Sequence, residues 1–465
     1  MDLIKRAVVV LGMLISELAL ISHGSIVFPV HHKLKGHPEP FRAMREHDAA
    51  RHNRRALTAL DFGLGGLLDK NWLYYTKLRV GTPPVEYNLQ IDSGSSIPWL
   101  MCHTNKDSPD KTDDGIEIKL YNPRKSSTSR LQRCQMDKCI DHTPFGDGSE
   151  MVGFFVWDIL EFGRVNKDFH TEKTSTQIRF GCGTRKSGDK APPESIGILG
   201  LSTDRESLIS QLVEQEITKA EFAHCLDRSK GGGIFAIGEV VEPKVKTTTL
   251  YVDNVGHYVT SLTGFFVAGE YIDIPLLTEL KGLSAIIDSG ASMSILPRYL
   301  YDPIVKKIFA QQPHLKYENN SQVFKSYCFK GFEGNVDEVF PTIIFRFEEG
   351  LTLTVPAHDY IIPDSDGALC VTYSMSEQAL GPEHKDLIIL GDDAFTNKFV
   401  VYDLDRQTIG WVKHDCTTSI KVKDRQSGSV LLPFAQLNLL GIDEFPCIGI
   451  GQLDLWCLTR QFELD

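Results

Sequence analysis

The chain has 465 residues, of which 42% are hydrophobic, so it can bury a large core, which we expect to be divided between two lobes. Its formal net charge of −12 is unevenly distributed: residues 1–71 hold 10 Lys/Arg and 7 Asp/Glu, which leaves 39 and 54 in the remainder. An acidic body without a long basic stripe argues against nucleic acid as a partner.

Residues 1–24 have the pattern of a secretory signal peptide. Lys5 and Arg6 form a positive end, the apolar run 7–21 follows, and small residues come next. A transmembrane anchor is the alternative, but the run is short and Glu17 interrupts it. We therefore expect the protein to enter the secretory pathway and to reach the extracellular space, the cell wall or the vacuole.

The ten cysteines predict disulfide bonds rather than metal ligands, because the chain has a secretory signal and lacks a zinc-like CxxC pair. We therefore expect no metal site. The spacing of the cysteines alone does not determine how they pair.

Short strand patterns fill the rest of the chain, without the alternating strands and helices of a parallel α/β sheet, so we predict an all-β protein. Strands are predicted at residues 73–80, 87–91, 153–162, 178–181, 233–237, 285–287, 342–347, 351–355, 369–373 and 399–403. Short helices are predicted at 207–215 and at 297–310, where a proline stands in the first turn. The glycines 231–233 lack the Lys-Ser/Thr of a phosphate loop and predict a hairpin turn. The charged, cysteine-containing segment 102–139 is predicted to be a surface loop.

Two acidic loops repeat one pattern. Residues 91–96 are Ile-Asp-Ser-Gly-Ser-Ser, and residues 287–292 are Ile-Asp-Ser-Gly-Ala-Ser. A single Asp-Ser-Gly is common in turns. Two buried acids in matching settings, Asp92 and Asp288, are costly unless something compensates them. The repeat therefore indicates a duplicated lobe in which each half presents one acid.

Further motifs make residues 73–416 resemble the pepsin-like aspartic proteases, in particular their secreted plant-type group. Besides the acid loops, the matching motifs are Ile-Leu-Gly at 198–200 and 389–391, Tyr-Asn-Pro at 121–123, Phe-Gly-Asp-Gly-Ser at 145–149, Phe-Gly-Cys-Gly at 180–183, and Val-Tyr-Asp at 401–403 ahead of Ile-Gly-Trp at 409–411. The resemblance implies an all-β, bilobal pepsin-like fold, with barrel-like lobes at 72–255 and 256–416 and an active-site cleft between them. It also implies an endopeptidase that cleaves peptides or proteins, uses no cofactor and, we expect, is a monomer.

The resemblance makes Asp92 and Asp288 the catalytic dyad. Two carboxylates within hydrogen-bond reach share one proton over a range of pH. The ionised member can then take a proton from an attacking water while the protonated member donates to the peptide carbonyl.

The residues beside the acids have expected supporting roles. Gly94 and Gly290 allow the backbone to approach the acids closely. Ser93 and Ser289 match family threonines whose hydroxyls brace one loop against the other.

One position differs between the two loops. Ser95 matches a family hydroxyl that donates to the first acid, whereas the second loop has Ala291. A carboxylate without that donor is harder to ionise, which predicts activity at higher pH than in a relative with Ser or Thr there.

The predicted flap departs from the family. Phe145 and Gly146 occupy the flap, where relatives carry a Tyr that closes over substrate and hydrogen-bonds the tryptophan matched by Trp99. Phe keeps the ring and loses the hydroxyl. The approach 140–144 is short and ends in Pro144, which cannot donate to a strand ladder, so one arm of the flap hairpin is predicted to be incomplete. The alternative function is therefore a weakly active or inactive protease-like protein that binds peptides or enzymes.

The remaining predictions concern the flanks and the second lobe. The basic, His-rich residues 25–71 can be a disordered leader or, as the resemblance favours, an inhibitory pro-segment whose cations neutralise the cleft acids. The resemblance pairs Cys328 with Cys370, and Asn319 begins the one glycosylation sequon. In the C-terminal tail, 417–465, the apolar run is short and interrupted by polar residues, which argues against a lipid anchor.

Overall fold

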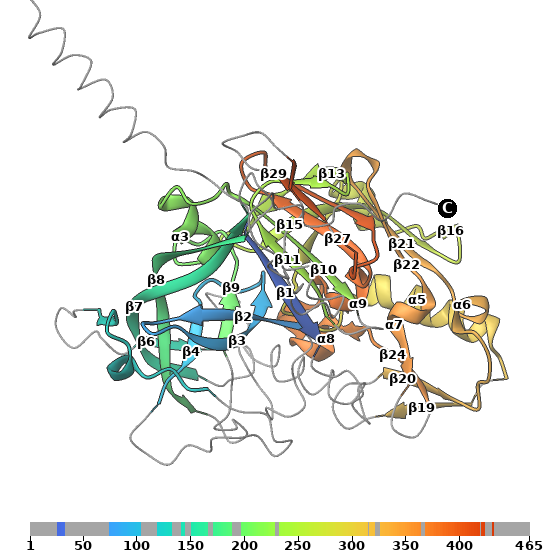
Figure 1. Ribbon diagram of the computed structural model, residues 1–465. Coiled ribbons are helices and arrows are strands. Elements are labelled where there is room, and N and C mark those ends of the chain that lie inside the picture. Colours follow the sequence, from blue (N-terminus) through green and yellow to red (C-terminus); the bar gives the residue numbers. More distant parts are fainter. Residues whose placement is uncertain are drawn as a thin grey trace, which may run out of the picture.

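In the computed structural model (Figure 1), the described residues are 26–32, 74–103, 119–132, 141–144, 150–165, 171–187, 197–227, 232–314, 316–320, 326–363, 368–418, 420–423 and 430–431. Strands dominate this part of the chain and form four sheets. The elements of the first half (blue and green) lie mostly on the left in Figure 1 and those of the second half (yellow to red) on the right. The predicted all-β fold is confirmed.

The largest sheet contains strands from both halves. In spatial order its strands are β13 (Lys246–Thr249), β28 (Thr408–Lys413), β27 (Lys398–Asp403), β10 (Glu221–Asp227), β11 (Gly232–Ile237), β1 (Ile26–His32), β2 (Tyr74–Val80), β3 (Val85–Asp92), β9 (Gly197–Gly200), β4 (Trp99–Met101), β8 (Thr171–Ser187), β7 (Glu150–Val165) and β5 (Arg130–Leu131), with β6 (Asp141–Pro144) paired to β7. Two antiparallel pairs, β10–β27 and β13–β28, join the halves, and the β10–β27 pair lies near the centre of the molecule. We refer to β10, β11, β27 and β28 as the inter-lobe strands.

The second half builds its own sheets. The nine-stranded sheet contains β22 (Thr352–Val355), β21 (Ile343–Phe347), β15 (Tyr258–Val267), β17 (Leu283–Ile287), β26 (Ile388–Leu390), β18 (Ile295–Leu296) and β25 (Ser374–Met375), with β14 (Tyr251–Val252) and β16 (Glu270–Tyr271) paired to β15. A four-stranded sheet contains β19 (Lys316–Asn320), β20 (Ser326–Lys330), β24 (Leu369–Val371) and β23 (Ile361–Pro363).

The duplication inferred from the acid loops is visible in strand pairing. In the first half β3 pairs in parallel with β9, which places Ile91 opposite Leu199. In the second half β17 pairs in parallel with β26, which places Ile287 opposite Leu390. The next pairings match as well: β4 and β18 each run antiparallel to the Ile-Leu-Gly strand and parallel to one further strand. Each strand that leads into an acid loop and its Ile-Leu-Gly partner strand therefore form one structural unit, which occurs once in each half.

Both predicted helices are present. Helix α3 (Leu208–Glu214) begins after Ser207, whose hydroxyl accepts from the backbone N–H of Ser210. Helix α5 (Arg298–Gln311) begins after Pro297 and buries residues at helical spacing, Leu300, Tyr301, Ile304, Val305 and Ile308. The other helices of the described chain are short: α4 (Pro275–Glu279), α6 (Val336–Val339), α7 (Ala357–Tyr360), α8 (Ser376–Ala379) and α9 (Asp392–Phe395).

The prediction that residues 102–139 form a surface loop is wrong at two residues, Cys102 and Tyr121. Cys102 is buried in a disulfide with Cys182, and Tyr121 is 1% exposed. The phenol of Tyr121 donates to Asp158 at 2.6 Å, and its ring packs edge-on against Phe180. The charged composition of this segment concealed two residues that belong to the core of the first lobe.

Part of the predicted C-terminal tail, 417–465, forms strands that pair with the rest of the protein. Residues 421–423 form β29 and residues 430–431 form β30, which join β12 (Val240–Glu242) in a three-stranded sheet. Ile420 and Val422 are fully buried, and the Cys225–Cys416 disulfide lies just before them. At the other end, β1 lies between β11 and β2, so seven residues of the predicted pro-segment belong to the large sheet. The predicted signal peptide lies outside the described residues.

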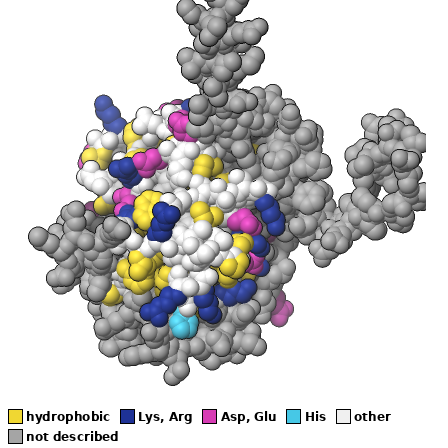
Figure 2. Space-filling view, turned by 60° about the vertical axis from the view of Figure 1, so that its left-hand side comes forward, with side chains coloured by type: hydrophobic (Ala, Val, Ile, Leu, Met, Phe, Trp, Pro, Cys, Tyr) yellow, Lys and Arg dark blue, Asp and Glu magenta, His cyan; other side chains and the backbone are white. Residues whose placement is uncertain are grey.

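The face on the left of Figure 1 is brought forward in Figure 2. Among the described residues on this face, basic and acidic side chains lie among hydrophobic ones.

Candidate active site

Both acids of the repeated loops are buried at the ends of equivalent strands. Asp92 ends β3 and Asp288 directly follows β17, and their exposed fractions are 2% and 1%. In each loop the N–H of the glycine two residues later donates to the carboxylate, from Gly94 to Asp92 Oδ1 at 2.9 Å and from Gly290 to Asp288 Oδ1 at 2.8 Å. Such bonds favour the ionised form of a buried carboxyl group.

A reciprocal brace of serines joins the two loops. The N–H of Ser93 donates to Ser289 Oγ at 3.1 Å, and the N–H of Ser289 donates to Ser93 Oγ at 2.9 Å. Each hydroxyl also donates across to the strand before the opposite acid: Ser93 Oγ to the carbonyl of Ile287 at 3.2 Å, and Ser289 Oγ to that of Ile91 at 3.4 Å. Four hydrogen bonds thus fix two segments that are 196 residues apart.

Glycine at position 94 brings the first loop against the second acid. A Cβ added to Gly94 would lie 2.7 Å from Asp288 Oδ1 and 2.8 Å from its other carboxylate atoms, too close for any side chain. Gly94 is two residues from Asp92, whose carboxylate binds the Gly94 N–H. The two acids therefore belong to one cluster.

The cluster is asymmetric at the positions after the glycines. Ser95 Oγ donates to Asp92 Oδ2 at 2.8 Å, whereas the corresponding Ala291 is fully buried and has no hydroxyl. The hydroxyl at this position is therefore present in the first loop and absent from the second.

A second buried acid pair, Asp392 and Asp393, follows the second Ile-Leu-Gly motif. Asp393 accepts from Ser294 Oγ at 2.6 Å, from the Ser294 N–H at 3.1 Å and from Thr372 Oγ1 at 2.7 Å. Asp392 donates its N–H to the carbonyl of Ala291 at 2.8 Å. This region ties the second acid loop to α9.

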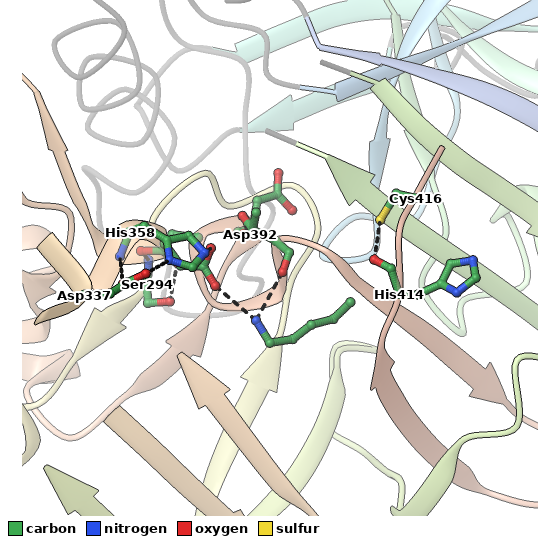
Figure 3. Close-up of polar contacts among 10 residues, drawn as sticks. Ser294, Asp337, His358, Asp392, His414 and Cys416 are labelled. Atoms are coloured by element: carbon green, nitrogen blue, oxygen red, sulfur yellow. Dashed lines mark hydrogen bonds and ion pairs between the residues drawn. The ribbon is translucent and has the colours of Figure 1, made fainter. Parts of the chain in front are cut away.

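A buried cation, Lys398, interacts electrostatically with Asp393. Figure 3 shows the region around Asp392, Ser294 and His358. Lys398 Nζ is 3.2 Å from Asp359 Oδ2 and donates to the carbonyl of Thr396 at 3.1 Å. Burial lowers the pKa of Lys398, and the charge of Asp359 opposes that shift. His358 continues the polar contacts toward the surface, where its Nδ1 is 2.6 Å from Asp337. No local sequence pattern indicates this network, because Asp337, Asp359 and Lys398 come from different segments of the chain.

Two further residues that sequence reasoning missed lie behind the brace. Tyr402 in β27 is fully buried, and burial is the main reason that its pKa is raised, with the charges of Asp288 and Asp392 adding to the effect and Ser93 opposing it. His224 in β10 is also buried, and burial lowers its pKa to about 3.

The other predicted residues are distributed as follows. Trp99 is buried under β8, where the absence of a Cβ at Gly181 makes room for its ring. Cys328 and Cys370 form a disulfide between β20 and β24. Asn319 lies in β19.

Part of the flap can be described. The incoming strand β6 has four residues and pairs with β7, so that Pro144 is opposite Glu150. Phe145 and Gly146 lie outside the described residues.

Within the described ranges, no group of three or more His, Cys, Asp or Glu side chains could hold a metal ion. A search of the same residues finds no helix with the length and apolar character needed to cross a membrane.

Two halves that each present a buried acid after one strand of a parallel pair, joined by a reciprocal hydroxyl brace, define the class of pepsin-like aspartic proteases. The chain belongs to this family: the model of the eukaryotic aspartyl protease family matches residues 73–414. It is 38% identical over 442 residues to Aspartic proteinase 36 of Arabidopsis thaliana, with 90% of each chain covered. It is 36% identical over 447 residues to Aspartic proteinase 39 of the same plant, with 92% of each chain covered.

Solved structures with similar folds include two basic 7S globulins. Basic 7S globulin from soybean aligns with a TM-score of 0.56 at 16% identity, covering 84% of this chain and 96% of the globulin. Conglutin gamma from lupine seeds aligns with a TM-score of 0.59 at 15% identity, covering 90% of this chain and 98% of conglutin. At these identities the likeness concerns the fold.

Proposed function

We propose that this protein is an aspartic-type endopeptidase in which Asp92 and Asp288 form the catalytic dyad. The observation that carries the proposal is the contact between the two acid loops. The brace of Ser93 and Ser289 joins them, and Gly94 lies against the carboxylate of Asp288. The names of the two Arabidopsis relatives support the same reaction class.

The proposed mechanism uses the coupling between two neighbouring carboxyl groups. Such a pair holds one proton over a range of pH, because ionising both places like charges side by side. The ionised acid accepts a proton from a water molecule as its oxygen attacks the peptide carbonyl. The protonated acid donates to the carbonyl oxygen as negative charge develops there. Membership in a protease family implies that the substrate is a peptide or a protein.

Digestion of an unstructured protein at acid pH tests the proposal. The purified chain should cleave it, a pepstatin-like transition-state mimic should block cleavage, and Asp92→Asn should abolish it. Asp273→Asn is the matched control, since it removes an exposed carboxylate in the second lobe. Cleavage that survives Asp92→Asn, or that the mimic does not inhibit, contradicts the proposed dyad.

A binding protein with little or no proteolytic activity is the second candidate. The short incoming strand β6 favours it, because a less complete flap excludes water and orders substrate less well. In that case the same assay gives no cleavage, while the transition-state mimic still binds and raises the melting temperature of the protein.

Residues 25–71 are further proposed to inhibit the enzyme as a pro-segment. Five residues of β1 pair with β11, so the start of this segment is held by the same sheet that joins the two halves. Chain beginning near Asn71 should then cleave substrate faster than the full-length chain, and equal rates would refute the inhibitory role. A site near Arg54 and Arg55 is one proposed point of processing.

We propose that the protein acts in the secretory pathway or beyond it. Three disulfides in the described chain support this location, because such bonds persist in oxidising compartments. Fractionation of cells that express the tagged full-length chain tests it.

A further inference from the structure

Gln90 places a buried amide at a position where the second half has an apolar side chain. It lies in β3, two residues before Asp92, and is 6% exposed. The equivalent residue, two positions before Asp288, is Ile286 in β17, which is 3% exposed. The two residues correspond in register, because each pairs with the isoleucine that begins an Ile-Leu-Gly motif. A buried amide is costly unless it is hydrogen-bonded, so Gln90 needs polar partners that isoleucine does not need.

The Gln90 side chain reaches the acid loop of the other half. Its Nε2 donates to the carbonyl of Gly290 at 3.3 Å, across 200 residues of sequence. The N–H of the same peptide group, which belongs to Ala291, donates to the carbonyl of Asp288 at 3.2 Å. The Gly290 N–H in turn donates to the Asp288 carboxylate. Gln90 therefore holds the peptide group that closes the turn around the second acid.

Tyr258 makes the reciprocal contact from the second half. It lies at the start of β15 and is fully buried, and its hydroxyl donates to the carbonyl of Leu201 at 2.5 Å. The N–H of the same peptide group, which belongs to Ser202, donates to the carbonyl of Ser95 at 3.0 Å. The Leu201 N–H donates to the carbonyl of Asp92 at 2.9 Å. Tyr258 therefore holds a segment that is hydrogen-bonded to the first acid loop at two positions.

Aromatic packing fixes the ring of Tyr258. Its centroid lies 5.6 Å from that of Phe222 in β10 and 4.9 Å from that of Tyr402 in β27. These two strands are paired with each other and belong to the inter-lobe strands. The Tyr258 hydroxyl is therefore held in a fixed direction by the strands that join the two halves.

We propose that Gln90 and Tyr258 are positioning residues of the proteolytic site. Each comes from one half and holds the acid loop of the other half, Gln90 directly and Tyr258 through residues 201 and 202. Together with the serine brace, they set the separation at which Asp92 and Asp288 share one proton. The inference rests on the proposed role of those two acids.

Gln90→Met tests the first contact, because it removes the amide and keeps a side chain of similar length. We expect kcat to fall by about threefold to tenfold, as for loss of one net hydrogen bond, with KM nearly unchanged because the acids move and the substrate contacts do not. The rate is expressed per active site titrated with a pepstatin-like mimic, so that unfolded molecules do not lower it. Gln211→Met is the matched control and should keep the wild-type kcat per site. Gln211 is 7% exposed, and its Nε2 donates to the carbonyls of Arg179 and Glu206, which belong to neither acid loop.

Two further variants test the hydrogen bonds themselves. Gln90→Glu supplies a donor at acid pH, because a protonated carboxyl group donates through its O–H and burial raises its pKa. It should recover most of the wild-type kcat there. Tyr258→Phe keeps the packed ring and should lower kcat with KM nearly unchanged, whereas Tyr360→Phe should not. Tyr360 is another buried tyrosine, and its hydroxyl donates to the carbonyl of Pro341 at 2.6 Å.

The proposal is overturned if Gln90→Met or Tyr258→Phe keeps the wild-type kcat per titrated site. It is also overturned if Gln211→Met lowers that rate as much as Gln90→Met does, or if Gln90→Glu is as slow as Gln90→Met at acid pH. Activity that persists in Asp92→Asn would instead refute the dyad itself, so the two failures are distinguishable.

Discussion

Glu221, at the start of β10, couples the stability of the lobe junction to pH. Its exposed fraction is 5%, and it lies directly opposite Asp403 of β27. Burial is the main reason that the pKa of Glu221 is raised from 4.5 to about 7, and the charges of Asp403 and Glu239 add to the shift. The N–H of Val240, which donates to Glu221 Oε1 at 2.8 Å, opposes it.

The sign and size of the effect follow from this shift. The unfolded chain ionises Glu221 above pH 4.5, while the folded protein keeps it protonated up to about pH 7. The contribution of protonated Glu221 to the free energy of unfolding is therefore complete below pH 4.5. It is lost as the pH rises to about 7. A difference of 2.5 pKa units corresponds to a loss of up to about 3 kcal/mol in the free energy of unfolding.

Glu221→Gln removes the titration and keeps an oxygen that can accept the Val240 N–H. We expect the variant and wild type to have similar unfolding free energies in urea below pH 4.5, and the variant to be more stable above pH 7 by up to about 3 kcal/mol. Glu161→Gln is the control, since it removes a carboxylate paired with Arg79 at 2.7 Å on the surface of the first lobe. A stability difference for Glu221→Gln that stays constant from pH 4 to pH 8 would refute the reasoning.

Three further substitutions test the site and its surroundings. Gly94→Ala forces a Cβ against the Asp288 carboxylate, so we expect kcat/KM to fall by roughly 100-fold, whereas Gly264→Ala, whose added Cβ meets its nearest atom at 3.4 Å, should leave it unchanged. Lys398→Met removes the ammonium group that lies 3.2 Å from the buried Asp359 carboxylate, and urea denaturation should show a loss of about 3–5 kcal/mol; a loss below 1 kcal/mol would contradict that pairing. Ala291→Ser supplies the second acid with a hydroxyl donor, so the acid limb of the pH–rate profile should move to lower pH, and an unmoved limb would refute the role assigned to this position.

The sequence predicted the parts of the fold whose signal is local. Strand patterns located ten of the thirty strands in the described chain, and helical spacing at 207–215 and the proline at 297 located both longer helices. The repeated Asp-Ser-Gly loops indicated the duplication, because each copy carries its acid and glycine within three residues.

The residues that sequence reasoning missed depend on contacts between distant segments. All seven residues of β10 are buried, so alternation could not assign a face to His224, and its partner Tyr402 is 178 residues away. Tyr121 was assigned to a surface loop because its neighbours are charged, although its phenol reaches Asp158 on β7. In both cases the partner strand determines burial, and the local pattern does not.

The two acid loops differ at one position, where the first has Ser95 and the second has Ala291. This difference changes the hydrogen-bond donors available to the two acids. Asp92 and Asp288 accept matching hydrogen bonds from the glycine N–H groups of their own loops, and the serine brace is reciprocal between the two loops. The hydroxyl of Ser95 reaches the first acid alone, while the charge of the second acid acts on Tyr402. A symmetric pair would share a proton evenly, whereas an extra donor on one side stabilises the charge there. Serine at position 291 would give the second loop the hydroxyl that Ser95 supplies in the first.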